Sequence, residues 1–387
     1  MKCLYITSKP IYPIIDGGCF AMDSFLKTLS HAGFIIDHFT ISTQKHPFRP
    51  DAYPEGIHVE SVEIDTRIKT LQSFKYLFKK GSYNVARFHS EEVTEKIEAL
   101  IKKNTYDFVI LDSLYATTYL SSIRKYFAGK IYLRSHNCEA QIWFDLAKNE
   151  QNIPKSIYFK KLAKDLHIYE STILNKLDGV FAISQEDQEA FMKNNTKAKV
   201  CVIPVHLESN DQDEFKIEKG KIFHVGNMDW VPNREAVERL VKLFHESIHS
   251  DDQLKLSLVG KNIEKHYKSS KGIEIQGFVD DLKGFVQKSG ILVSPITSSS
   301  GVRVKILEMM AYGIPVITTP SGAKGIFSEG KNAVEIQETN TALIDAILRI
   351  TKDDEKLAEM QTLSKEYIKK YHNIEQIASD LKSFILD

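Results

Sequence analysis

One stretch of sequence decides the fold, residues 291–325, which read ILVSPITSSSGVRVKILEMMAYGIPVITTPSGAKG. Two short apolar runs, at 291–296 and 314–319, flank a segment of helical periodicity at 302–312. Apolar runs joined by a helix are typical of a βαβ crossover on a parallel sheet. In such sheets the ligand binds outside the carboxyl ends of the strands. A small polar loop at 297–301 is predicted to lie at that edge.

The chemistry of this loop indicates an anionic ligand. Its hydroxyls and backbone N–H groups are predicted at a helix N-terminus, which favours an anion and often a phosphate. Arg303 and Lys305 follow the loop at once, and Glu308 comes next on the same predicted helix. These residues predict a site for an anion that also carries hydroxyl groups.

The composition is that of a globular chain with two domains. Its 387 residues are too many for one ordinary core. Because Lys plus Arg and Asp plus Glu both number 51, bulk charge argues against a general nucleic-acid binder. No apolar run approaches the roughly 20 residues of a membrane helix, and the first residues do not resemble a signal peptide. The four scattered cysteines fit a reducing compartment, so we expect a cytoplasmic protein without a metal site.

The first half begins with a strand, a glycine-containing loop and a helix. The pair Gly17-Gly18 ends the predicted loop at 8–18, and without Cβ atoms it allows a ligand to approach the backbone. A tight turn between strand and helix is the alternative interpretation, because no GxGxxG motif is present. Strands are predicted at 3–7, 34–42, 57–64, 107–112, 130–134, 179–184 and 199–204, and helices at 91–103 and 154–177.

Polar residues follow two of these strands. Asp112 ends one strand and His136 follows another, so both are expected at the ligand-binding edge of the sheet. His136 is a candidate base or hydrogen-bonding partner for a hydroxyl; alternatively it caps the next helix. Glu170, beside Tyr169, is a polar residue on a helix that otherwise packs. Asp112 and Glu170 are therefore candidates for an acceptor site or for a structural role.

Residues 66–88 form a basic segment without a single acid. Apolar residues within it fall on one predicted helical face, which suits peripheral contact with an anionic lipid or a lipid-linked acceptor. The alternative is a solvated basic helix with a core-facing stripe.

The second half repeats the βα pattern after a polar linker at 206–219. Gly226 and Asn227 follow its first strand, and the glycine allows close approach of a ligand. We predict a first domain of residues 1–205 plus about 371–387, and a second domain of residues 206–370. Strands are predicted at 221–225, 254–260, 273–277 and 332–336, and helices at 234–249, 280–289, 341–351, 353–370 and 374–386.

These motifs together resemble glycosyltransferases of the GT-B fold, especially family 4. The resemblance is strongest over residues 221–325, through VGNMDWVPN, GFVDDL and SSSGVRVKILEMMAYGIPVITTPSGAKG. The first half agrees through the Gly17-Gly18 loop, RSHNCEA and AISQED.

The resemblance implies an α/β fold of two Rossmann-like domains that face each other across a cleft, with the C-terminal helix crossing back to the N-terminal domain. The second domain would bind a nucleotide-diphosphate sugar and the first the acceptor, with no metal or other cofactor. Arg303, Lys305 and the N–H groups near Ser300 and Gly301 would hold the diphosphate, and Glu308 the ribose hydroxyls.

The resemblance also implies that His136 and the Gly17-Gly18 loop contact the transferred sugar or its phosphate, and that the reaction retains anomeric configuration. The sequence departs from the family pattern at two positions. Ser300 stands where an acid is common, and Asn227 stands where a cation is common. Arg303 and Lys305 are therefore expected to carry more of the diphosphate site.

The predicted function is transfer of a hexosyl group from a nucleotide-diphosphate sugar to a glycan or lipid-linked acceptor, as in polysaccharide biosynthesis. A sugar-nucleotide epimerase of the same fold is one alternative, and a non-catalytic nucleotide-sugar-binding partner subunit is another.

Overall fold

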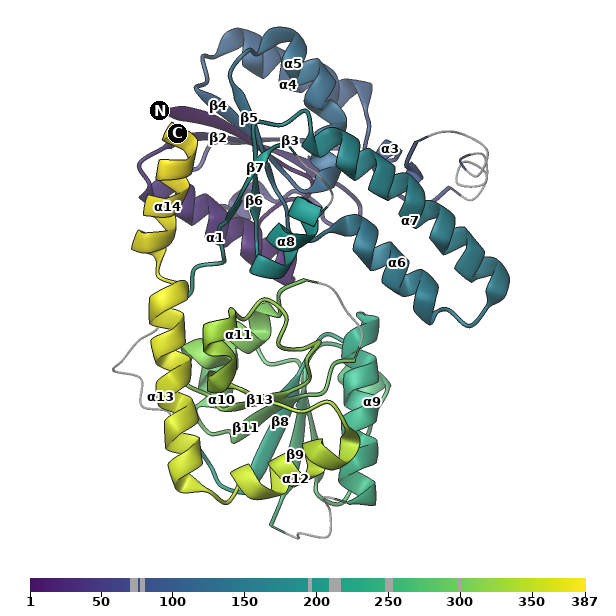
Figure 1. Cartoon of the computed structure of the whole chain (residues 1–387), viewed down its shortest axis with the longest axis vertical. Coiled ribbons are helices and arrows are strands. Elements are labelled where there is room, and N and C mark those ends of the chain that lie inside the picture. Colours follow the sequence, from purple (N-terminus) through teal and green to yellow (C-terminus); the bar gives the residue numbers. More distant parts are fainter. Residues whose placement is uncertain (70–75, 77–80, 194–196, 209–216, 248–252, 298–300) are drawn as a thin grey trace. The chain divides into compact units, whose positions relative to one another are not determined.

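The computed structural model describes the whole chain except residues 70–75, 77–80, 194–196, 209–216, 248–252 and 298–300. The chain folds as two compact units, each of which is an α/β layer structure (Figure 1). Unit 1 consists of Met1–His206 and Ile374–Asp387, and unit 2 of Leu207–Asn373.

Unit 1 contains a parallel sheet of seven strands in the order β3-β2-β1-β4-β5-β6-β7. The strand order changes direction between β1 and β4, which places the ligand-binding edge at the carboxyl ends of these strands. The strands are β1 (Lys2–Thr7), β2 (Ile35–Ser42), β3 (Val59–Glu63), β4 (Phe108–Asp112), β5 (Lys130–Arg134), β6 (Gly179–Ala182) and β7 (Lys199–Val202).

Each face of this sheet has its own hydrophobic core, and successive side chains of β1 point alternately into the two cores. Leu4 and Ile6 point into one core, whereas Cys3 and Tyr5 point into the other, as expected for the two-residue period of a strand. The helices are α1 (Gly17–His31), α3 (Tyr83–Ala86), α4 (Glu91–Lys103), α5 (Leu120–Tyr126), α6 (Glu139–Asn149), α7 (Ile153–Leu174), α8 (Gln185–Lys193) and α14 (Ile374–Leu386), with 3-10 turns η1 (Pro50–Ala52) and η2 (Leu114–Tyr119).

The C-terminal helix belongs to unit 1. Ile377, Leu381 and Ile385 of α14 are buried in the same core as Phe25 and Leu29 of α1. Figure 1 shows the two helices side by side, and it shows the N- and C-termini close together. The predicted return of the last helix to the first domain is confirmed.

Unit 2 contains a parallel sheet of six strands in the order β10-β9-β8-β11-β12-β13, with the change of direction between β8 and β11. The strands are β8 (Lys221–Val225), β9 (Lys255–Val259), β10 (Ile273–Gly277), β11 (Ile291–Ser294), β12 (Val316–Thr318) and β13 (Glu335–Ile336). The helices are α9 (Val231–Glu246), α10 (Leu282–Val286), α11 (Val304–Ala311), α12 (Asn340–Ile350) and α13 (Asp354–Tyr371), with 3-10 turns η4 (Ile263–Lys265) and η5 (Ser328–Ala333).

The stretch 291–325 forms the predicted crossover, since β11, α11 and β12 follow one another and β11 pairs in parallel with β12. One expectation was wrong in detail, and one helix was missed. Gly17 and Gly18 are not in the loop but open α1, because the Asp16 carboxylate caps the helix by accepting from the N–H of Cys19. Helix α6 was not predicted.

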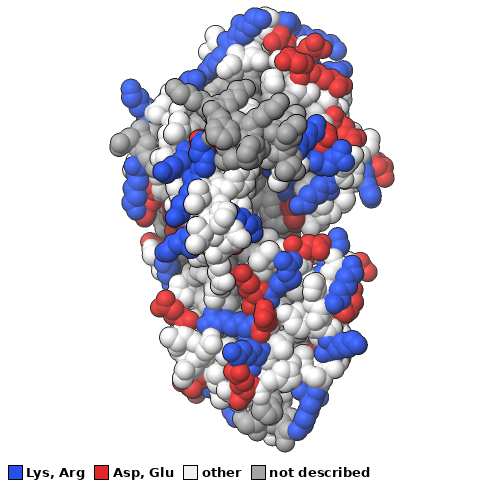
Figure 2. Space-filling model, turned by 90° about the vertical axis from the view of Figure 1, so that its right-hand side faces the viewer, with Lys and Arg blue, Asp and Glu red and all other residues white. Residues whose placement is uncertain are grey.

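Two surface expectations concern charge and membranes. Figure 2 shows Lys and Arg interspersed with Asp and Glu on the face that it displays. Within the described residues no helix is both long and apolar enough to cross a bilayer. Residues 70–75 and 77–80 of the basic segment 66–88 lie outside the described residues. Of its described cations, Arg67 and Lys69 both lie against Asp65, at 2.9 and 3.6 Å.

Candidate functional site

Helix α11 begins just beyond the carboxyl end of β11, where the strand order of unit 2 reverses. Gly301 has a φ of +83°, which lets the chain turn into the helix. Arg303 is the N-cap residue, and its side chain makes no capping hydrogen bond. The N-terminus of α11 therefore begins at Arg303, and a helix N-terminus favours negative charge. Ser300, the predicted partner of Gly301, lies outside the described residues.

Two cations lie at this helix end. The guanidinium carbon of Arg303 is 5.1 Å from the ring centre of Trp230, which is a cation–π contact. Burial lowers the pKa of Arg303 to about 10, so the side chain stays charged at neutral pH. Lys305 is exposed at the surface, yet the surrounding protein lowers its pKa by desolvation.

Glu308 lies on the same helix and balances this charge. Burial raises the pKa of its carboxyl, while Lys305 and a hydrogen bond from Tyr312 act in the opposite direction. The Tyr312 hydroxyl lies 3.4 Å from Oε1. Helix α11 thus carries a cationic end followed by one carboxylate acceptor.

The loop after β8 closes on itself. A Cβ atom at Gly226 would lie 2.7 Å from the Asn233 side chain, so the missing side chain makes room for the start of α9. Asn233 Nδ2 donates to the Asn227 carbonyl at 2.9 Å, and Asn227 Oδ1 accepts from the N–H of Asp229 at 2.9 Å. The acceptor atom of the Asn227 amide is thus engaged within its own loop.

Three hydroxyls tie β12 and its following turn to the end of β11. Thr318 Oγ1 donates to the Ser294 carbonyl at 2.8 Å, Thr319 to the carbonyl of Ile296, and Ser321 to that of Thr297 at 3.0 Å. These bonds hold Ser294, Ile296 and Thr297 at the carboxyl end of β11.

In unit 1, Asp112 and His136 meet. Asp112 is fully buried, and His136 Nε2 lies 2.5 Å from its Oδ1 atom, while the hydroxyl of Tyr5 donates to Oδ2. Because Nε2 must carry the proton toward the carboxylate, Nδ1 is the acceptor of the neutral ring. The strand-end prediction thus placed two residues that the fold brings into contact.

Glu170 lies on α7 and contacts the start of α6. It is 1% exposed, and its Oε1 accepts from the N–H of Glu139 at 3.1 Å, at the start of α6. Burial and the neighbouring Glu139 charge raise its pKa to about 7. In the described residues its contacts are those of a helix cap.

The glycine pair of α1 lies beside a lysine. Lys9 Nζ is 2.6 Å from Asp16 Oδ1, and a Cβ at Gly18 would lie 2.8 Å from Nζ. His46 Nε2 lies 3.5 Å from the other Asp16 oxygen. Gly18 therefore makes room for a cation at the start of α1, and that cation is already paired with Asp16.

Comparison with known proteins identifies the second unit. Residues 219–353 match the family model described as Glycosyl transferases group 1. The match lies within unit 2, which we therefore call the group 1 domain. The match includes the α11 cluster and the loop after β8, and so the resemblance seen in the sequence is confirmed.

Relatives match along almost the whole chain. An uncharacterized 44.6 kDa protein in the cps region of Klebsiella pneumoniae is 20% identical over an alignment of 398 positions, which covers 98% of each chain. Sucrose-phosphate synthase from Thermosynechococcus elongatus has a TM-score of 0.72 and 17% identity, and covers 99% of this chain and 98% of its own. Alr3699/HepE from Anabaena, solved with UDP, has a TM-score of 0.68 and 14% identity, with 99% of each chain covered. The two parallel-sheet units therefore form the GT-B fold.

The predicted site residues fall into two groups. The group 1 domain holds Gly226, Asn227, Gly301, Arg303, Lys305 and Glu308, whereas unit 1 holds Gly17, Gly18, Asp112, His136 and Glu170. Among the residues that the structure describes, no group of three or more His, Cys, Asp or Glu is arranged to hold a metal ion.

Sequence reasoning missed the partners of these residues. Trp230 lies beneath Arg303 and Tyr5 lies against Asp112, and each of these contacts joins distant parts of the chain. Lys9 lies beside Gly18 within one connection. Trp230 was visible within the VGNMDWVPN motif, but nothing in the sequence showed which cation it would contact.

Proposed function

We propose that this chain transfers a hexosyl group from a nucleotide-diphosphate sugar to a glycan or lipid-linked acceptor. One observation carries the proposal: Arg303, Lys305 and Glu308 lie together at the start of α11, within the group 1 domain. A diphosphate needs cations and helix N–H groups, and a ribose needs a hydroxyl acceptor. The cluster supplies all three.

The chemistry follows from where charge develops. When the bond between the anomeric carbon and the phosphate oxygen breaks, negative charge grows on the nucleoside diphosphate and positive charge on the sugar. Arg303, Lys305 and the N–H groups of α11 stabilise the leaving group, because they are fixed before the reaction begins. Glu308 accepts from the ribose hydroxyls and orients the donor. We propose that no metal is required and that anomeric configuration is retained.

Unit 1 has a matching part in the proposal. His136, fixed by Asp112, presents Nδ1 as an acceptor for a sugar hydroxyl, and the start of α1 with Gly17 and Gly18 lies at the phosphate or the sugar. The UDP complex of Alr3699/HepE supports a uridine nucleotide as the first ligand to test.

The test uses purified full-length protein, a panel of UDP- and other nucleotide-diphosphate sugars, and charge-neutral variants. Arg303→Gln and Glu308→Gln are expected to reduce donor turnover by at least about tenfold, which corresponds to the loss of one charged hydrogen bond worth about 1.4 kcal/mol or more. Arg349→Gln and Glu366→Gln are the matched controls, since Arg349 pairs with Glu335 at the surface and Glu366 is exposed. Full activity in both site variants would contradict the assignment.

The same assay tests the finer parts of the proposal. Turnover that persists in excess chelator is expected for metal-independent transfer, and NMR of the new glycosidic bond reports its anomeric configuration. Incubation of donor without acceptor is expected to leave the sugar unisomerised; an isomerised sugar would instead identify an epimerase.

A non-catalytic role is the second candidate, and the loop after β8 favours it. Asn227 stands where a cation is common, and its side-chain oxygen is engaged within its own loop. Tight nucleotide binding without turnover across a broad acceptor panel would support a nucleotide-sugar-binding partner subunit.

A further inference from the structure

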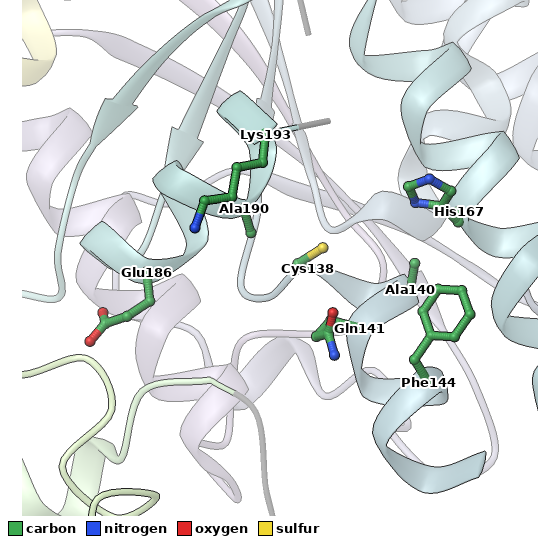
Figure 3. A pocket seen from close by; sticks show the side chains of 8 residues that line it. All are labelled: Cys138, Ala140, Gln141, Phe144, His167, Glu186, Ala190 and Lys193. Carbon is green, nitrogen blue, oxygen red and sulfur yellow. The ribbon is translucent and has the colours of Figure 1, made fainter. Parts of the chain in front are cut away.

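A cavity of about 310 Å³ lies in unit 1 among α6, α7 and α8. Figure 3 shows Glu186 and Lys193 of α8 on one side and Phe144 and His167 on the other, with Gln141 between them. None of these five residues belongs to the site described above.

The position of the cavity is that of a ligand site. Helix α6 follows β5 and α8 follows β6, so both helices begin at the ligand-binding edge of the sheet. Cys138 lines the cavity, and His136, two residues earlier, contacts Asp112. A molecule in the cavity would therefore be bound next to the loop that carries His136.

The lining combines an aromatic wall with polar groups of both charges. The rings of Phe144 and His167 meet edge to face, with centres 6.3 Å apart. Gln141 Nε2 donates to Asp145 Oδ1 at 2.8 Å, and the side-chain carbonyl of Gln141 can accept from a ligand hydroxyl. Lys193 makes a long ion pair, 3.8 Å to Glu189, and its ammonium group also has donors for a ligand.

This chemistry fits a neutral ring that bears hydroxyl groups. The C–H face of a pyranose packs on an aromatic side chain, while its hydroxyls both donate and accept at the rim. Because Glu186 and Lys193 carry opposite charges, the lining favours a ligand without net charge, and the polar groups disfavour a purely apolar molecule. Ligand sites span roughly 300–1,000 Å³, so this cavity accommodates about one ring.

We propose that the cavity among α6, α7 and α8 is a carbohydrate subsite that holds one neutral pyranose ring of the acceptor. The assignment to the acceptor rests on the proposed glycosyl transfer. Phe144 forms the ring platform, and Gln141, His167, Glu186 and Lys193 select the hydroxyl pattern.

The experiment is a titration of the full chain with methyl pyranosides of glucose, galactose, mannose and N-acetylglucosamine, and with methyl glucuronide, followed by saturation-transfer NMR. At least one neutral glycoside is expected to bind, and Phe144→Ala and Glu186→Gln are each expected to weaken it by at least fivefold. Leu146→Ala is the matched control, because Leu146 lies on the same helix and is 46% exposed. Glu186→Gln keeps the test valid if Phe144→Ala does not fold.

The outcomes separate this inference from the proposed function. Absence of binding by every neutral glycoside, binding that the cavity variants leave unchanged, or binding of the glucuronide alone would each overturn the subsite. UDP-induced stabilisation of the chain and donor turnover report on the group 1 domain independently. Cavity-dependent glycoside binding without any nucleotide binding would support the subsite and contradict the proposed transfer.

Discussion

Asp112 is a buried carboxylate whose charge is stabilised by its hydrogen-bonding neighbours. An isolated buried carboxylate would be costly, but Asp112 accepts from Tyr5 and His136 and feels the positive charge of Arg134. Arg134 is itself fully buried, donates to the Ile203 carbonyl at 2.5 Å, and has a pKa lowered to about 10 by burial. The network fixes the ring of His136 rather than merely placing it nearby.

Glu170 is also a buried carboxyl group, but its surroundings disfavour the charged form. Its cap of α6 is retained in either protonation state, but burial and Glu139 disfavour the ionised form and raise its pKa to about 7 from 4.5. Between about pH 4.5 and 7 the Glu170 carboxyl therefore keeps its proton in the folded state, whereas in the unfolded chain it is ionised. Over that window the contribution of Glu170 to stability falls as the pH rises.

Glu170→Gln is expected to abolish this loss of stability with rising pH. A glutamine keeps an acceptor oxygen for the N–H of Glu139, and it cannot ionise. Relative to the parent chain, the variant should gain on the order of 2 kcal/mol of unfolding free energy between pH 5 and pH 8, since one unit of pKa shift is worth about 1.4 kcal/mol. Urea unfolding at both pH values measures the gain.

The control for this prediction is Glu55→Gln, at an exposed position of the same unit. An equal pH trend in Glu55→Gln and Glu170→Gln would show that Glu170 is not the source of the effect.

At the scale of elements, the strand ends of the group 1 domain approach each other through glycine. Gly260 follows β9 with a φ of +141°, and a Cβ there would lie 1.8 Å from the Gly226 carbonyl oxygen. Gly260 N–H in turn donates to the Gly277 carbonyl at 2.7 Å. The neighbouring ends of β8, β9 and β10 are thereby joined at the edge where the loop of Gly226 begins.

Gly260→Ala is expected to destabilise the chain by at least about 2 kcal/mol, because both the overpacking and the backbone conformation are unfavourable. Gly277→Ala is the matched control: its φ of +68° is left-handed, but the nearest atom to a Cβ is 3.8 Å away, so about 1 kcal/mol is expected. Thermal unfolding monitored by circular dichroism compares them. Equal losses would mean that the contact with Gly226 is relaxed at little cost.

The elements themselves were largely predictable. Helices 91–103 and 374–386 and strands 130–134, 221–225 and 273–277 match the structure residue for residue, because apolar periodicity and flanking polar residues mark them. Helix α6 escaped prediction because its bulky apolar residues are consecutive and only its two alanines are buried. Helix α11 begins two residues later than predicted, since the turn at Gly301 extends to Arg303.

The candidate site was predictable in part. Parallel strands end at the same edge, which was enough to select Asp112 and His136 before their contact was known. That contact depends on β4 lying next to β5, with Asp112 paired to Arg134, and no local pattern reports strand order. The same limit applies to Tyr5, which contacts Asp112 from a distant part of the chain.

At the scale of the whole molecule, the chain leaves unit 1 after His206 and returns at Ile374. The two connecting segments are bound together, because the N–H of Leu207 donates to the His372 carbonyl at 3.0 Å. His372 is 1% exposed and packs against Tyr367 and Phe327. The two connecting segments are thus held together at one point of the group 1 domain.

Residues 207–373 expressed alone are expected to unfold in one cooperative transition, because their core and sheet are complete within the segment. UDP should raise the melting temperature of this fragment, since Arg303, Lys305 and Glu308 all lie within it. The comparison is residues 1–373, which lack α14 and therefore expose the core face of α1. A fragment 207–373 that stays unfolded, or a 1–373 chain as stable as the whole, would refute this independence.

The hydrogen bond between Leu207 and His372 has a further consequence. It makes the group 1 domain an insertion whose entrance and exit coincide, so its removal leaves two chain ends that a short linker can join. A domain joined in this way can be exchanged for another without a change in the chain path of unit 1. Sequence changes in the group 1 domain and in the sheet that carries His136 can then proceed as separate evolutionary events.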